Sequence, residues 1–277
     1  MTVGIIGLGI IGGSMAKAIK ANTHHKVFGL DINDETMTMA LMSGAIDGRL
    51  TDERLSECQL VMAALTPEVL VKTMTEKAPF MKGTTFIDLC GIKRAIYEPL
   101  SALAVKYEFN YIGGHPMAGK EVSGFANSSA ELFKGASMIV TPDSRSDIIT
   151  LDKLKDFFLA IGFGVVTFST LEEHDRIIAY TSQLAHITSN AYIKSPTAQM
   201  HMGFSAGSYR DLTRVARLDE NMWTELFMAN SDYLIEELRM LIDSLGEFLE
   251  VLETKDKEKL TQLLREGREL KETAGGN

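Results

Sequence analysis

The chain has 277 residues, 45% of them hydrophobic and 23% charged, which is the composition of a globular protein with one large or two modest domains. Its net charge of −9 argues against a nucleic-acid partner, and no apolar run approaches the roughly 18 residues of a membrane span. Cys58 and Cys90 form neither a disulfide framework nor a metal motif, and no signal peptide precedes Val3. We therefore expect a cytoplasmic protein that holds no metal.

The first 31 residues carry a pattern for dinucleotide binding. An apolar run over residues 3–6 leads into Gly7-Leu8-Gly9-Ile10-Ile11-Gly12, a G-x-G-x-x-G turn that opens a helix-forming stretch. A second apolar run, residues 26–30, ends on Asp31. In such a βαβ unit the glycines allow the tight turn and the approach of a pyrophosphate, and the terminal acid binds the ribose hydroxyls. The alternative, an ordinary βαβ turn, leaves Asp31 unexplained.

Asp31 also indicates which dinucleotide is bound. A carboxylate repels a 2′-phosphate, and no arginine follows in Asp31-Ile32-Asn33-Asp34, so the cofactor expected is NAD rather than NADP. Leu65 and Thr66, after a later strand, should also face this cofactor.

Strand-like and helix-like segments alternate up to residue 168. Further strands are expected over residues 59–63, 84–88, 111–114, 137–140 and 165–168, and helices over residues 67–78, 92–107 and 147–161. This alternation predicts an α/β domain over residues 1–168, with a doubly wound, mostly parallel sheet covered by helices on both faces.

After residue 168 the strands stop, which predicts an all-helical second domain over residues 169–277. Its helices are expected over residues 172–194, 209–216, 220–252 and 256–272, before a frayed end at 274–277. The long third helix carries an apolar seam with 4-3 spacing, made by Leu234, Leu238, Leu241, Leu245, Phe248 and Leu252. Such a seam favours a homodimer, the alternative being a bundle packed within one chain.

The segments after three strands should converge on the nicotinamide, because ligands of open α/β sheets bind beyond the carboxyl ends of the strands. They are residues 64–67, 88–93 and 113–124. In the last of them His115 directly follows a predicted strand, is flanked by glycines and is fixed by Pro116. Imidazole can take a hydroxyl proton near neutral pH, so we interpret His115 as a catalytic base. The remaining histidines of the first 180 residues, His24, His25 and His174, are assigned structural roles.

A polar stripe marks the first helix of the second domain. Ser182, His186 and Ser189 or Asn190 recur every three to four residues and so share one helix face. We interpret the stripe as the wall of a site, the alternative being a buried hydrogen-bond network.

A basic cluster follows, in which Arg210, Arg214 and Arg217 share a helix face at helical spacing. Guanidinium groups suit carboxylates, so this cluster would supply the positive field that an anionic substrate needs in an acidic chain. The alternative is a solvated basic surface.

In these residues the chain resembles the prephenate/arogenate dehydrogenase family of tyrosine biosynthesis. The resemblance covers nearly the whole chain and rests on the glycine turn of residues 7–12, on Gly114-His115-Pro116-Met117-Ala118-Gly119, on the Ser182/His186 helix and on residues 210–216. It implies a Rossmann domain, a helical dimerisation domain, NAD, and oxidative decarboxylation of prephenate to 4-hydroxyphenylpyruvate, with arogenate as the alternative substrate.

The resemblance also implies roles for individual residues. His115 would be the base or acceptor at the ring 4-hydroxyl, His186 a second substrate-site histidine, and Arg214 the anchor of the substrate side chain. Glu121 and Asp211 would be carboxylates of an ionic network around that arginine, with Asp211 supplied by the same or by the partner subunit. The residues expected to contact substrate are Gly91, Lys120, Glu121, Ser182, Arg210, Asp211 and Arg214.

Two positions depart from the family pattern. Gly91 stands where many members have a serine that contacts the substrate hydroxyl, which leaves open the hydrogen-bond partner of that hydroxyl. Lys120 stands where a threonine is common, and it adds a positive charge.

The same residues distinguish this function from two alternatives. A β-hydroxyacid dehydrogenase would be expected to use a lysine on the first helix after the sheet, where this chain offers His186 and Asn190. A nucleotide-sensing protein without turnover would not need His115, His186 and Arg214 together.

Overall fold

The computed structural model describes residues 1–143 and 145–275. The chain divides into two compact units, Met1–Asn230 and Ser231–Asn277. The domain boundary expected after residue 168 remains a prediction. Within the described residues, no helix is both long enough and apolar enough to cross a membrane.

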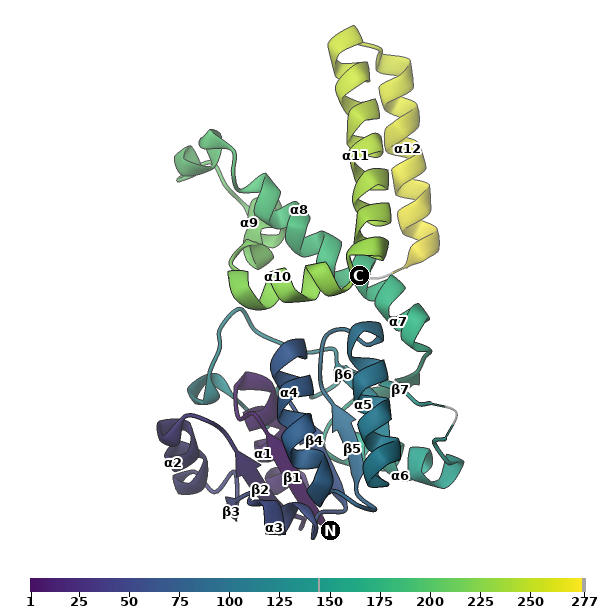
Figure 1. Ribbon diagram of the computed structural model, residues 1–277. Coiled ribbons are helices and arrows are strands. Elements are labelled where there is room, and N and C mark those ends of the chain that lie inside the picture. The colour runs from purple at the N-terminus through teal and green to yellow at the C-terminus, as the bar shows by residue number, and fades with distance from the viewer. Residues whose placement is uncertain (144, 276–277) are drawn as a thin grey trace. The chain divides into compact units, whose positions relative to one another are not determined.

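An eight-stranded sheet forms the centre of the first unit, with the strand order β3-β2-β1-β4-β5-β6-β7-β8 (Figure 1). All neighbouring strands are parallel except β6 and β7, which pair antiparallel. The predicted mostly parallel sheet is therefore confirmed. The strands are β1 (Thr2–Ile6), β2 (Lys26–Leu30), β3 (Gly48–Arg49), β4 (Leu60–Ala63), β5 (Thr85–Asp88), β6 (Asn110–Pro116), β7 (Ser137–Thr141) and β8 (Val165–Phe168).

Helices cover both faces of this sheet, because alternate strand residues point to opposite sides. Val3 and Ile5 of β1 belong to one buried cluster, which also takes in α1, α2 and α6. Ile6 of the same strand belongs to a second cluster, with α4 and α5. The helices are α1 (Ile10–Asn22), α2 (Asp34–Met42), α3 (Asp52–Leu55), α4 (Pro67–Lys77), α5 (Arg94–Tyr107) and α6 (Ile148–Ala160).

Three short elements between residues 34 and 55 were not predicted: α2, β3 and α3. Helix α2 buries only Met37 and Ala40, and β3 has two residues, so neither produces a clear periodic apolar pattern. The start of α2 did have a local signal, because the Asn33 side chain accepts a hydrogen bond from the Thr36 N–H as an N-cap.

The predicted helical segment over residues 172–194 is present as one run with an interruption. It consists of α7 (Leu171–Ile178), a π-helical stretch over Ala179–Leu184 and α8 (Ala185–Tyr192). A π-helix has more residues per turn than an α-helix, so the face assumed for the polar stripe is not regular through it.

The helical segment that carries the arginines ends at Ala216 as predicted, but its last turn is a 3₁₀ helix. Helix α9 (Gly207–Thr213) is followed by one 3₁₀ turn, Arg214–Ala216. Arg217 then has an extended backbone, so the prediction that it shares a helix face with Arg210 and Arg214 is wrong.

The prediction of a single helix over residues 220–252 is also wrong, because the helix is broken at Asn230. Helix α10 (Glu220–Ala229) ends there and α11 (Ser231–Thr254) begins after it. The buried Asn230 side chain accounts for the break, since its Nδ2 donates to the Asp175 carbonyl and to Gln183 Oε1, at 2.9 and 2.8 Å.

The second unit is a hairpin of α11 and α12 (Lys257–Ala274), which lie side by side in Figure 1. Along the predicted seam, Leu234 is buried, whereas Leu245 and Leu252 are 57% and 61% exposed. Packing within this unit therefore leaves part of the seam uncovered. The frayed end was expected over residues 274–277, of which 276 and 277 lie outside the described residues. Ala274 is the last residue of α12.

Candidate active site

The glycine turn between β1 and α1 has the geometry that a bound dinucleotide requires. Gly7 has a φ of +82°, and a Cβ there would lie 2.5 Å from the Ala64 carbonyl oxygen. A Cβ on Gly12 would lie 1.8 Å from the Gly7 carbonyl oxygen, so α1 can pack this closely only with glycine at that position. A Cβ on Gly9 would meet no atom within 4 Å. The turn is thus closed on the protein side and open at Gly9, where a pyrophosphate would approach.

The carboxylate of Asp31 closes the same turn from the end of β2. Its Oδ2 accepts a hydrogen bond from the Leu8 N–H at 2.7 Å, and its Oδ1 accepts one from the Asn33 N–H at 2.9 Å. Ile10 begins α1, Leu65 lies against Gly7, and Thr66 is the residue before α4. The structure therefore brings together the residues predicted to hold the cofactor, and their donors and open space fit NAD.

These contacts predict how the cofactor preference can be changed. In Asp31→Ser with Ile32→Arg, the carboxylate that repels a 2′-phosphate is lost and a cation is gained, at a position whose side chain is fully exposed. The ratio of kcat/KM for NADP to that for NAD should rise about tenfold or more, because one repulsion is removed and one charged hydrogen bond is gained. Steady-state kinetics with both cofactors measure it, and Ile32→Arg alone is the control. A wild-type protein that turned over NADP as well as NAD would contradict this role of Asp31.

His115 lies inside β6 and not after it, which corrects the predicted strand end. The strand extends to Pro116 because β7 pairs with it antiparallel, with His115 opposite Ile139. The ring is partly buried, and the loop after β5 lies beside it: a Cβ on Gly91 would be 3.9 Å from His115 Nε2. The Nε2 edge of His115 therefore lies beside Gly91, at the carboxyl end of the sheet.

His174 makes the contact on the other side of that ring, which the sequence analysis missed. His174 Nε2 lies 2.9 Å from His115 Nδ1, and His174 Nδ1 lies 2.7 Å from Asp175 Oδ1. The structural role assigned to His174 is therefore incomplete. The available signal was the spacing of His174 and Ile178 on the buried face of α7, which places a titratable ring where an apolar residue is usual.

The environment of His115 favours its neutral form. Burial lowers its pKa well below the ordinary value for histidine, and His174 and the Lys93 ammonium lower it further. Lys93 is itself fully buried and held by Asp88 and by the Gly114 carbonyl, which accepts from Nζ at 2.6 Å. A neutral imidazole in this position can accept a proton.

The polar stripe contributes one ring, His186, to a cluster with Trp223 and Arg214. His186 stacks on Trp223 of α10, with ring centroids 3.9 Å apart, and its Nδ1 lies 2.8 Å from the Ser182 carbonyl oxygen. Ser182 thus acts on His186 through its backbone. Burial lowers the pKa of His186, and the nearby Arg214 guanidinium lowers it as well. Trp223 was not predicted as a site residue, because its contact with His186 joins two separate helices.

Arg214 forms an ion pair with Glu121, from the loop after β6. This contact brings together two of the residues expected around the substrate side chain. Arg210 lies apart from them, with its Nε 3.6 Å from Asp211 Oδ1 on exposed side chains. Lys120, next to Glu121, is also exposed.

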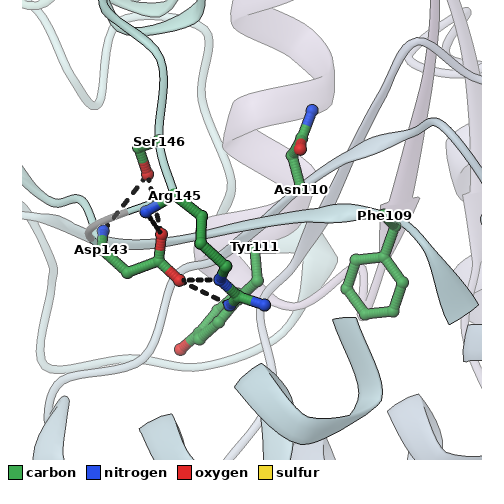
Figure 2. Close-up of a pocket in the computed structure, with 6 residues that line it drawn as sticks. All are labelled: Phe109, Asn110, Tyr111, Asp143, Arg145 and Ser146. Carbon is green, nitrogen blue, oxygen red and sulfur yellow. Dashed lines mark hydrogen bonds and ion pairs between the residues drawn. The ribbon is translucent and has the colours of Figure 1, made fainter. Parts of the chain in front are cut away.

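A small pocket lies at the opposite end of β6 from His115 and is not the candidate site. Figure 2 shows it beside Asn110, where β6 begins, with Arg145 directed at Asp143. Its volume of about 50 Å³ is below that of ordinary ligand sites. The Arg145 guanidinium already donates to Asp143 Oδ2 and to Ser101 Oγ.

A dinucleotide turn at β1–α1 and a neutral histidine at the carboxyl end of β6 define an NAD-dependent oxidoreductase. Comparison with known families agrees. The model described as "Prephenate dehydrogenase, nucleotide-binding domain" matches residues 15–167, and "Prephenate dehydrogenase, dimerization domain" matches residues 170–266. The chain belongs to the prephenate dehydrogenase family, as its motifs predicted.

Individual relatives are distant but align along almost the whole chain. A prephenate dehydrogenase of Bacillus subtilis is 29% identical over 98% of this chain and 75% of its own length. A cyclohexadienyl dehydrogenase of Zymomonas mobilis is 28% identical over 95% of this chain and 92% of its own. The solved prephenate dehydrogenase of Aquifex aeolicus, in complex with hydroxyphenyl propionate and NAD⁺, superposes with a TM-score of 0.81 at 26% identity, over 99% and 98% of the two chains.

Proposed function

We propose that this protein catalyses the NAD-dependent oxidative decarboxylation of prephenate to 4-hydroxyphenylpyruvate in tyrosine biosynthesis. The observation that carries the proposal is the position of His115, with its Nε2 edge beside Gly91 at the carboxyl end of the sheet that also bears the dinucleotide turn. The family to which the chain belongs supplies the substrate class.

In this reaction the protein forms no covalent bond to the substrate; it orients the reactants and transfers one proton. NAD, when bound, accepts the hydride lost from the ring carbon that carries the hydroxyl. His115 takes the hydroxyl proton at Nε2, so that a carbonyl develops on that carbon. This carbonyl is conjugated to the carbon bearing the ring carboxylate, and it draws the electrons of the breaking C–C bond as carbon dioxide leaves. The ring becomes aromatic, and His115 returns its proton to the oxygen of the phenol.

Gly91 gives the substrate hydroxyl room to reach His115. The nearest atoms to an added Cβ belong to Leu226 and the His115 ring, at 3.6 to 3.9 Å, and glycine places no side-chain donor of its own beside Nε2. The hydroxyl of the substrate therefore donates directly to the imidazole, the contact that proton transfer needs.

The carboxylates of prephenate need positive charge in an acidic protein. Arg214 is the anchor for the substrate side chain, because its guanidinium can donate two hydrogen bonds to one carboxylate. It pairs with Glu121 of the loop after β6 and lies near His186 of α8. Lys120 adds a second cation in that loop.

Lys120 should affect the choice between prephenate and arogenate. Arogenate carries an ammonium where prephenate has a keto group, and Lys120 repels it. Lys120→Ala should therefore raise the KM for prephenate by about two- to fivefold, the loss of one exposed charge interaction, and leave the KM for arogenate unchanged or lower. Lys120→Arg, which keeps the charge, is the control. Equal effects of Lys120→Ala on the two substrates would exclude this role.

We further propose that the protein is a cytoplasmic homodimer that associates through its helical part. Apolar side chains that a monomer would leave in water support this. Ile242 and Leu249 of α11 are 57% and 59% exposed, and Phe204 before α9 is 92% exposed. Sedimentation of the purified protein would distinguish a dimer from a monomer.

The test of the function is an assay of the purified protein with NAD and either prephenate or arogenate, following NADH formation. Prephenate should be the better substrate. Preferential use of arogenate would make the protein an arogenate dehydrogenase, and failure to use either substrate would overturn the proposal.

A further inference from the structure

A chain of three hydrogen-bonded groups runs from the candidate base into the protein. His115 Nδ1 and His174 Nε2 are 2.9 Å apart, and His174 Nδ1 and Asp175 Oδ1 are 2.7 Å apart. His174 is 2% exposed and Asp175 fully buried. Because both residues are buried, they act on a bound substrate through His115.

The Asp175 carboxylate is fixed by two backbone donors at the start of α5. Oδ1 accepts the Lys93 N–H and Oδ2 accepts the Arg94 N–H, both at 2.8 Å. Burial by itself would raise the pKa of Asp175, but the hydrogen bonds from His174 and these amides outweigh it, and the net shift is downward. Asp175 is thus an ionised acceptor that cannot rotate away.

The ionised Asp175 fixes which nitrogen donates and which accepts in each of the two hydrogen bonds. A carboxylate can only accept, so His174 Nδ1 must carry a proton and donate it. Burial lowers the pKa of His174 despite the neighbouring carboxylate, and in its neutral form Nε2 is a lone-pair acceptor. His115 Nδ1 must therefore be the donor in the contact between the two rings, which leaves the lone pair of His115 on Nε2.

We propose that His174 and Asp175 are positioning residues that hold His115 in the tautomer with its proton on Nδ1 and its lone pair on Nε2. This inference rests on the proposed function of His115. Only that tautomer presents a base to the space beside Gly91, because Nδ1 already faces His174. The opposite tautomer would direct an N–H at the substrate hydroxyl and could not take its proton.

The first test needs no substrate. In the full-length protein labelled with ¹⁵N-histidine, saturated with NAD and held at mildly alkaline pH, two-bond ¹H–¹⁵N spectra report which ring nitrogen of His115 is protonated. The His115 signals are identified by their loss in His115→Asn. We expect Nε2 to be unprotonated. A proton on Nε2 would overturn the inference directly, whatever substrate the enzyme proves to use.

The second test compares two substitutions of His174. His174→Phe keeps a ring of similar shape but offers no acceptor to His115, so His115 should shift to the Nε2–H tautomer, and kcat should fall roughly 10–100-fold. His174→Gln places an amide oxygen near the former Nε2 position and should restore most of this turnover. Both variants should bind NAD with wild-type Kd, since the glycine turn and Asp31 are untouched.

The two tests separate this inference from the proposed function. If neither prephenate nor arogenate is oxidised, the proposed function is wrong, but the measured tautomer of His115 still shows whether His174 positions it. If His174→Phe keeps both the Nδ1–H tautomer and wild-type turnover, the positioning role fails while the function stands. If His174→Phe does not fold, the spectra of the unsubstituted protein remain decisive.

Discussion

His115→Asn should lower kcat with prephenate by roughly 10²–10⁴-fold, the usual contribution of a general base. Asparagine fills similar space beside Gly91 and can still contact His174, but it cannot accept a proton near neutral pH. The NAD Kd should stay within about twofold, because the contacts proposed for the cofactor lie at Gly7–Gly12 and Asp31. Single-turnover measurements of NADH formation, with separate titration of NAD binding, measure both quantities.

The pH dependence gives an independent check on the same base. Burial lowers the pKa of His115, so the neutral, active form persists to lower pH than for an ordinary histidine. The acid limb of kcat/KM should therefore lie below pH ~6.5, the ordinary histidine value, with activity lost as the pH falls through the shifted pKa. This limb should be absent from the residual activity of His115→Asn.

His24→Asn is the matched control for His115, because His24 is an exposed histidine before β2, away from the candidate site. It should leave kcat within about twofold. Near-normal turnover in His115→Asn would remove His115 from the mechanism and move the role of base to His186.

Arg214→Ala should raise the KM for prephenate about tenfold or more. A charge-assisted hydrogen bond contributes roughly 1.5–3 kcal/mol. The substitution also leaves the Glu121 carboxylate without the ion pair that Arg214 forms with it, which adds repulsion toward an anionic substrate. Arogenate keeps the side-chain carboxylate, so its KM should rise as well. The KM for NAD should barely change.

Arg268→Ala is the control for this substitution. Arg268 of α12 has a side chain 66% exposed, close to the 63% of Arg214, and it also pairs with glutamates, so the change in charge and exposure is matched. It should leave all three KM values unchanged. Unchanged KM for both substrates in Arg214→Ala would mean that the arginine cluster is a solvated surface, and the substrate assignment would lose its main electrostatic support.

The sequence by itself determined the features that depend on neighbouring residues. The glycine turn, its helix and the terminal Asp31 are a local pattern, because the tight turn and the helix N-terminus are built from consecutive residues. The alternation of strands and helices up to Phe168 likewise predicted the sheet, since a parallel strand pair needs a crossover between its members. His115 was identifiable from its glycine neighbours and from the apolar run that leads up to it, although the strand itself extends past it to Pro116.

Only the tertiary structure decided which side chains act together with His115. His174 is 59 residues further along the chain than His115. The two rings meet because β7 pairs with β6, β8 pairs with β7, and α7 follows β8. The stacking of Trp223 on His186, the Glu121–Arg214 pair and the break at Asn230 are also contacts between distant segments. Periodicity describes one helix at a time, so it could not show the π-helical stretch or the end of α9 before Arg217. Such contacts are fixed by how whole elements pack, which is why they were absent from every local pattern.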